Sequence, residues 1–152
     1  MGNCWSVSTV PPKPPTLEDC VEYIPTAGVV VSVYDGDTFT LAVWNNEIQK
    51  WTKWSVRVAR VDCPELRTKN PNEKQIALKA KTFVEERILH KRVELKNVSR
   101  EKYGRILADV FVANEPKSIN DLLIQNRLAV PYDGGTKHVP DDWVVWHEKD
   151  RA

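Results

Sequence analysis

Gly28-Val-Val-Val-Ser-Val-Tyr34, Asp35-Gly36 and Asp37-Thr-Phe-Thr-Leu-Ala-Val-Trp44 follow one another along the chain, and this stretch sets the expected fold. The first segment is short and β-branched, which favours a strand. The last segment alternates polar and apolar residues, which is the period of a strand buried on one face. Asp35-Gly36 is a strong signal for a tight hairpin turn. We therefore expect two antiparallel strands joined at residues 35–36.

The remaining chain predicts more strands and two or three helices. Further strands are expected at residues 48–61, 91–98 and 105–113. The first of them should bend between Trp54 and Val56. From apolar periodicity and N-cap residues, helices are expected at residues 72–90, from Ser118 to Asn126, and from Asp141-Asp142 onward. Five strands of antiparallel type around an inserted helix predict an α+β, mainly β fold, a five-stranded Greek-key barrel of the OB type.

The composition excludes several classes of protein. The 152 residues correspond to about one domain. With 22 basic and 21 acidic residues, the net charge of +1 excludes a simple polybasic nucleic-acid binder. No run approaches the ~18 apolar residues of a membrane span, and no apolar segment typical of a secretory signal follows the N-terminus. The three cysteines lack CxxC spacing, so we expect an intracellular protein in a reducing compartment, without a disulfide framework or structural zinc.

The chain divides into three parts. Residues 1–26 form an expected flexible arm, in which Pro11-Pro12-Lys13-Pro14-Pro15 is typical of a stiff linker, with an SH3-type ligand as the alternative. Residues 27–132 form the expected barrel domain, and residues 133–152 a C-terminal extension with a short helix. The net charge is −2 in each end segment and +5 in the middle. That pattern permits a polyanionic partner, but an ordinary solvated surface explains it equally well.

Charged residues cluster at three places, residues 35–38, 57–65 and 101–105. Taken singly, each cluster is explained by a hairpin turn or by surface ion pairs. Together they supply the groups that phosphodiester hydrolysis needs. The carboxylates of Asp37 and Asp62 are hard ligands of the kind that Ca²⁺ accepts. The carboxylate of Glu65 can orient or deprotonate a water. The guanidiniums of Arg57 and Arg105 suit bidentate phosphate contacts.

Three segments carry a resemblance to a known family. Tyr34-Asp-Gly-Asp-Thr-Phe-Thr-Leu41, Arg57-Val-Ala-Arg-Val-Asp-Cys-Pro-Glu65 and Lys102-Tyr-Gly-Arg-Ile-Leu-Ala108 resemble the staphylococcal nuclease (thermonuclease) family, in its order and at its spacings. The resemblance covers about residues 27–132. It implies a calcium-dependent, sugar-nonspecific nuclease that hydrolyses DNA and RNA and leaves 3′-phosphate ends. An OB-type groove favours single strands. We expect a monomer.

The resemblance also implies roles for individual residues. Asp37, Asp62 and the backbone carbonyl of Cys63 would bind calcium, with Asp35 as an outer carboxylate. Cys63 stands where the family usually has Thr. Arg57 and Arg105 would clamp the scissile phosphate, and Glu65 would be the base or the water-positioning group. Lys102 and Tyr103 would contact a neighbouring phosphate, and Tyr132 would form part of a base-stacking wall.

Two other functional classes remain open from the sequence. The first alternative is a catalytically silent OB-type module that binds nucleic acid or protein, as in Tudor-type relatives. The complete set of Asp37, Arg57, Asp62, Glu65 and Arg105 favours the enzyme over that alternative. The second is a membrane-tethered adaptor acting through the Pro-rich arm, which does not explain the three clusters.

The N-terminus carries a separate signal. Met1-Gly2-Asn3-Cys4-Trp5-Ser6 fits the myristoylation pattern with Gly2 as the acceptor, and Cys4 lies where a palmitoyl chain is often added. Two acyl chains anchor a protein stably at a membrane, whereas one binds only marginally. The arrangement is similar to acylated plant calcium-dependent nucleases, with a chance match as the alternative. In a eukaryotic host we expect tethering to the cytoplasmic face of a membrane.

Other notable side chains are interpreted as structural. Trp44, Trp51 and Trp54 are expected to fill or line the barrel, with base stacking as the less favoured alternative. The three histidines lack metal-ligand spacing and are expected at the surface; they are His90, His138 and His147. Arg60 is expected to face solvent.

Overall fold

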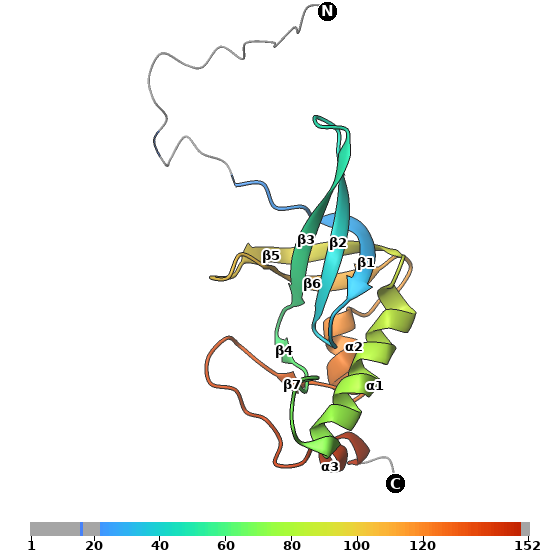
Figure 1. The fold of residues 1–152 in the computed structure, drawn as a ribbon, viewed down its shortest axis with the longest axis vertical. Coiled ribbons are helices and arrows are strands. Elements are labelled where there is room, and N and C mark those ends of the chain that lie inside the picture. The colour runs from blue at the N-terminus through green and yellow to red at the C-terminus, as the bar shows by residue number, and fades with distance from the viewer. Residues whose placement is uncertain (1–15, 17–21, 150–152) are drawn as a thin grey trace, which may run out of the picture.

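Five strands close into a barrel in the computed structural model, which describes Thr16 and residues 22–149 (Figure 1). In chain order the elements are β1 (Ala27–Val33), β2 (Thr38–Asn45), β3 (Lys50–Val58), β4 (Val61–Asp62), α1 (Pro71–Ile88), β5 (Arg92–Arg100), β6 (Ile106–Val112), α2 (Ile119–Gln125), β7 (Val130–Pro131) and α3 (Trp143–Glu148). The barrel order β1-β2-β3-β6-β5 and the three helices confirm the predicted mainly β, OB-type fold.

One pairing departs from the expected antiparallel pattern. β3 and β6 run parallel, with Val56 opposite Ile106 and Val58 opposite Ala108. The other four junctions of the barrel are antiparallel, including the closing pair β1 and β5. The expectation of antiparallel pairing throughout was therefore wrong at this junction, because residue periodicity specifies which face is buried but not which strand lies alongside.

The third predicted strand is broken, and the break lies later than expected. β3 ends at Val58, and Arg60 adopts a left-handed backbone with φ of 64°. The chain then continues as β4, which pairs with β7 in a separate two-stranded sheet outside the barrel. The predicted bend at Trp54–Val56 was wrong, because those residues continue the regular pairing with β2. The turn at Ala59–Arg60 directs β4 over one end of the barrel.

A buried asparagine holds this turn in place. Asn120, on α2, is almost fully buried. Its amide nitrogen donates to the Ala59 carbonyl at 2.6 Å and to the Asp109 carboxylate at 3.0 Å, and its amide oxygen accepts from the Val110 N–H. Since buried polar groups are costly unless they are bonded, this network fixes the path of the chain from β3 to β4.

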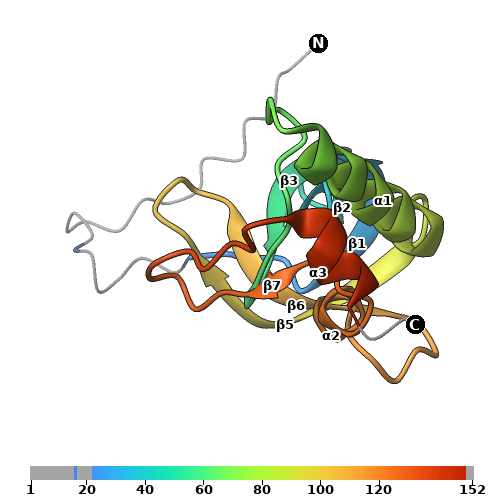
Figure 2. The same ribbon diagram turned by 90° about the horizontal axis from the view of Figure 1, so that it is seen from below.

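The helices begin where the sequence predicts. Asn70 caps α1 by accepting from two backbone N–H groups, and Pro71 occupies the first turn, where its missing N–H costs nothing. Ser118 and Asp142 cap α2 and α3 in the same way. The three helices lie at the same end of the barrel, as Figure 2 shows. Among the residues described, no helix is long and apolar enough to cross a membrane.

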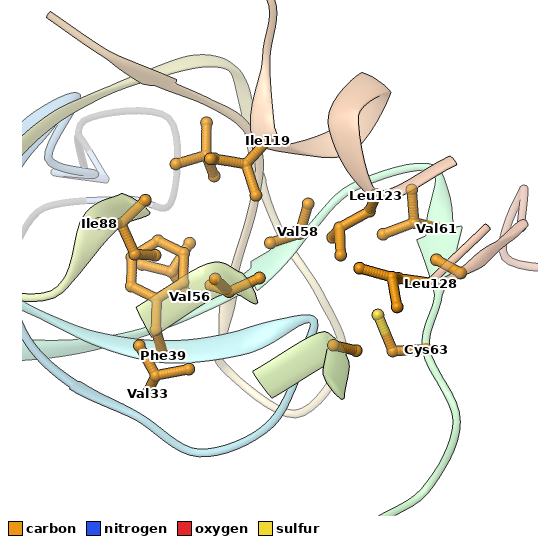
Figure 3. Packing of buried hydrophobic residues seen from close by; sticks show 14 of the residues in the cluster. Val33, Phe39, Val56, Val58, Val61, Cys63, Ile88, Ile119, Leu123 and Leu128 are labelled. Atoms are coloured by element: carbon orange, nitrogen blue, oxygen red, sulfur yellow. The ribbon is translucent and has the colours of Figure 1, made fainter. Parts of the chain in front are cut away.

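The core lies between the barrel strands and the helices (Figure 3). Fully buried side chains from both layers include Phe39, Val56, Ile76, Ile88 and Ile106. Cys63 also lies in this cluster, so its thiol is a core group.

Two predictions about aromatic and histidine side chains fail. Trp44 and Trp51 are 42% and 61% exposed on the β2–β3 hairpin, because they lie beyond the part of the hairpin that the barrel covers; only Trp54 packs against the core. His147 is buried rather than on the surface, with its Nδ1 3.3 Å from the Arg127 carbonyl, because α3 packs this side against the domain. His90 and His138 are exposed as expected.

Candidate active site

A tight turn positions the first pair of carboxylates. Between β1 and β2, Tyr34 N–H donates to the Thr38 carbonyl at 2.9 Å, and Asp37 N–H donates to the Asp35 carboxylate at 3.1 Å. Gly36 is required here, since a Cβ atom at this position would lie 2.7 Å from Cys63 Sγ. The turn therefore packs tightly against the segment that follows β4 and brings Asp37 beside it.

Arg57 links two segments that are 25 residues apart in sequence. Its Nη2 donates to Asp37 Oδ2 at 3.3 Å and to Asp62 Oδ1 at 3.0 Å, while its Nη1 donates to the Val61 carbonyl. Asp37 Oδ2 accepts a further bond from the Cys63 N–H at 3.1 Å. All three charged side chains are at least 90% buried. Breaking such a cluster is costly, because losing either partner leaves an uncompensated buried charge.

Negative charge is in excess around Arg57. Burial, together with the nearby charge of Asp37, raises the pKa of Asp35 from 3.8 to about 6. Burial, followed by the charges of the neighbouring carboxylates, also raises the pKa of the Cys63 thiol well above its ordinary value. The thiol therefore remains neutral, and carboxylates supply the negative charge of the pocket.

Sequence reasoning missed one residue of the site, Lys137. Its ammonium lies 2.8 Å from Asp62 Oδ1 and 3.7 Å from Glu65 Oε1. Desolvation lowers the pKa of Lys137, but the hydrogen bond to Asp62 and the charges of both carboxylates outweigh it, so the pKa is raised. The loop after β7 brings this lysine to the carboxylates. In the sequence, the Gly134-Gly135 turn was the one indication that the chain changes direction near Lys137.

Glu65 and Arg105 both line this pocket. The Glu65 side chain is 63% exposed, and its backbone N–H donates to the Glu73 carboxylate. The Arg105 Nε is paired with the Glu101 carboxylate, which holds the guanidinium at the edge of the pocket. An exposed carboxylate and a guanidinium that line one pocket are suited to hold a water and a phosphate oxygen, respectively.

Two adjoining cavities contain every predicted site residue that the structure describes. The first, of about 340 Å³, is lined by Asp35, Asp37, Arg57, Asp62, Cys63, Glu65, Arg105 and Lys137. The second, of about 630 Å³, is lined by Lys102, Tyr103 and Tyr132 and shares Arg57, Arg105 and Lys137 with the first. Gly2 and Cys4 lie outside the described residues.

The carboxylate cluster fits a hard cation. Its donors are oxygens, which Ca²⁺ and Mg²⁺ prefer, and the carboxylates of Asp35, Asp37, Asp62 and Glu65 line one cavity. Within residues 22–149, no three acidic, histidine or cysteine side chains are already arranged as a complete metal centre. Asp62 is bonded to Lys137 and Arg57 instead.

Comparison with known proteins identifies the family. Residues 55–143 match the family described as staphylococcal nuclease homologue, so the chain belongs to that family. A probable endonuclease of Schizosaccharomyces pombe is 34% identical over 85 residues, which cover 53% of this chain and 37% of the relative. A probable endonuclease of Podospora anserina is 30% identical over 129 residues, 72% of this chain and 47% of the relative. An uncharacterised protein of Methanocaldococcus jannaschii is 34% identical over 113 residues, which cover 61% of this chain and 52% of the relative.

The chain spans about half, or less, of the length of these relatives. The match to the family includes Arg57, Asp62, Glu65, Arg105 and Lys137, while Asp35 and Asp37 precede it in sequence. These comparisons establish the family and support a nuclease-family function.

Proposed function

We propose that the protein is a calcium-dependent nuclease that hydrolyses DNA and RNA without selecting the sugar, prefers single strands and leaves 3′-phosphate ends. One observation carries the proposal: two guanidiniums and three carboxylates from separate segments line one pocket, namely Arg57, Arg105, Asp37, Asp62 and Glu65. The neighbouring cavity, with Tyr103, Tyr132 and Lys102, offers a place for an adjacent nucleotide.

Each residue has a task in the proposed reaction. Arg57 and Arg105 bind the oxygens of the scissile phosphate and stabilise the charge that develops on them. Glu65 holds a water in line with phosphorus and takes its proton as the new P–O bond forms. The P–O5′ bond breaks, and the departing 5′ oxygen takes a proton from solvent. Asp37, Asp62 and the Cys63 carbonyl would hold the calcium ion, which when bound supplies further positive charge at the phosphate.

The silent binding module is less consistent with the burial of the cluster. Two carboxylates and a guanidinium that are at least 90% buried lose hydration, and apolar residues of similar volume often give equal or greater stability. A scaffold that needed only a basic surface would have no use for this arrangement. The surplus of carboxylates around Arg57 supports a site that handles charge during a reaction.

The test uses purified protein with single-stranded DNA, duplex DNA and RNA, each in calcium, in magnesium and in EDTA. Glu65→Gln removes the proton acceptor with little change in volume, and Glu86→Gln, at an exposed position on α1, is the matched control. We expect cleavage in calcium by the wild type and Glu86→Gln, with at least a 100-fold loss in Glu65→Gln. End-group analysis should show 3′-phosphates. Folded protein that cleaves nothing would favour the binding module.

We also propose that Gly2 is myristoylated and Cys4 palmitoylated, which would tether the enzyme to the cytoplasmic face of a membrane. The sequence pattern and the length of the arm support this proposal. Mass spectrometry of the protein expressed in a eukaryotic cell should show a myristoyl mass on the N-terminal peptide. Gly2→Ala should lose that mass and move from the membrane fraction to the supernatant. An unmodified N-terminus would refute the proposal.

A further inference from the structure

Two tryptophans near the tip of the β2–β3 hairpin remain outside the core. Trp44 and Trp51 lie directly opposite each other, with ring centroids 5.5 Å apart in an edge-to-face arrangement. β1 pairs with β2 only as far as Ala42, and β6 pairs with β3 only at residues 56–58. The ribbon beyond these contacts projects from the barrel, as Figure 1 shows. Neighbouring exposed apolar side chains of this kind are typical of a surface that binds a ligand.

The tryptophans share one face of the ribbon with the candidate active site. Opposite residues in an antiparallel pair, and every second residue along each strand, point to the same face. The face therefore carries four cross-strand pairs: Trp44–Trp51, Ala42–Lys53, Thr40–Ser55 and Thr38–Arg57. Thr38, Ser55 and Arg57 line the pocket of the carboxylate cluster. One continuous strip thus leads from that pocket to the exposed indoles.

The charge of the strip is complementary to a polyanion. None of its eight residues is acidic, although the chain as a whole has almost equal numbers of both signs. Lys53 is its exposed cation, since the guanidinium of Arg57 is buried and paired with Asp37 and Asp62. Lys53 is exposed between the tryptophans and the pocket. Aromatic rings combined with cations along a groove are the composition that binds single-stranded nucleic acid, because bases stack and phosphates pair.

A structural role accounts for only part of this arrangement. Cross-strand aromatic pairs stabilise hairpins, which explains why Trp44 and Trp51 are opposite each other. It does not explain why the pair lies on the face of the pocket, or why that face lacks acidic residues. We propose that the outer face of β2–β3, from Arg57 to the Trp44–Trp51 pair, is a track that binds single-stranded nucleic acid outside the cleavage site. This inference rests on the proposed nuclease function and specifies how its substrate is held.

The dimensions of the strip set the length of the bound strand. Trp51 lies six positions before Arg57 on β3, and six steps along a strand span about 20 Å. At the rise of about 3.4 Å per nucleotide in a stacked strand, this distance holds about six nucleotides. Oligonucleotides of about four nucleotides occupy the cleavage site alone, whereas those of 16 nucleotides reach the tryptophans.

The experiment measures binding separately from cleavage. Fluorescence anisotropy gives the Kd of labelled oligothymidylates of 4 and 16 nucleotides, in calcium, for bacterially expressed full-length protein that carries Glu65→Gln. In that background we compare Trp44→Ala/Trp51→Ala, Trp44→Phe/Trp51→Phe and the matched control Val145→Ala, an exposed apolar position on α3. The alanine pair should reduce the preference for the 16-mer over the 4-mer about tenfold. The phenylalanine pair should retain most of the preference, and Val145→Ala all of it.

A second variant keeps the test valid if the alanine pair unfolds the hairpin. Lys53→Gln leaves both tryptophans in place and should lower the slope of log Kd against log salt for the 16-mer by about 0.7. An unchanged 16-mer preference in the folded alanine pair, with an unchanged slope in Lys53→Gln, would overturn the track. So would loss of phosphatidylserine vesicle binding in the alanine pair with DNA affinity unchanged, because this would assign the tryptophans to a lipid surface. Failure of wild-type protein to cleave either oligonucleotide would instead refute the nuclease proposal.

Discussion

Lys137→Met should increase the affinity of the site for calcium. In the structure the Lys137 ammonium lies 2.8 Å from Asp62 Oδ1, where it occupies one of the oxygens expected to hold the ion. A bound cation therefore competes with this ammonium. Methionine has a similar length and no charge, so the substitution removes the competitor and leaves most of the packing.

The distance sets the size of the effect. Two unit charges 2.8 Å apart interact by about 1.5 kcal/mol in bulk water and by about 6 kcal/mol at an effective dielectric constant of 20. The Lys137 side chain is 46% exposed. Solvent screening therefore brings the interaction to the lower figure. Because about 1.4 kcal/mol corresponds to a factor of ten, we expect the calcium Kd of Lys137→Met to fall about tenfold.

Isothermal titration calorimetry of the metal-free protein measures this change directly and does not depend on activity. Lys79→Met, on the exposed face of α1, is the matched control and should bind calcium as the wild type does. A calcium Kd in Lys137→Met that equals or exceeds that of the wild type would show that Lys137 does not compete with the ion, and the reasoning would be wrong.

Three further perturbations follow from the geometry of the site. Gly36→Ala places a Cβ atom 2.7 Å from Cys63 Sγ. Urea denaturation should therefore show a loss of about 1–3 kcal/mol in unfolding free energy. A variant as stable as the wild type would refute the packing argument. Arg57→Leu removes the guanidinium that pairs with Asp37 and Asp62 and leaves only Lys137 beside Asp62, so it should cost about 3–5 kcal/mol by the same assay. A well-folded variant of unchanged stability would contradict the buried ion pairs. Asp35 has its pKa raised to about 6 in the folded protein, so the folded state retains a proton that the unfolded state releases. In EDTA the unfolding free energy should fall as the pH rises from about 4 to 6, and Asp35→Asn should flatten this fall; identical pH profiles would show that Asp35 is not responsible.

Local sequence specified most of the secondary structure. Alternation over residues 37–44 and the Asp35-Gly36 turn produced the hairpin of β1 and β2, because both signals act between neighbouring residues. The caps Asn70, Ser118 and Asp142 acted in the same way for the helices. These features are predictable because their hydrogen bonds form within a few residues.

Features that depend on distant contacts were not predictable in this way. The turn at Ala59–Arg60 needs Asn120, which is 61 residues from Ala59 in sequence and donates to its carbonyl. Trp51 is exposed because β6 stops pairing with β3 before it reaches this residue. The residue type of Trp51 does not indicate where that pairing stops. In both cases the deciding partner belongs to another element.

The site shows the same division between sequence and tertiary structure. By itself the sequence predicted which residues form the candidate site, because three charged clusters that are ordinary singly supply together the groups that phosphodiester hydrolysis needs. The predicted members of these clusters all line two adjoining cavities. Only the tertiary structure decided that Arg57 is bonded to both Asp37 and Asp62, and that Lys137 lies against Asp62. The reason is physical: residue type fixes the charge and donor atoms of a group, whereas its partners, and hence its pKa and its availability to a ligand, depend on which segments the closed barrel brings within about 4 Å of it.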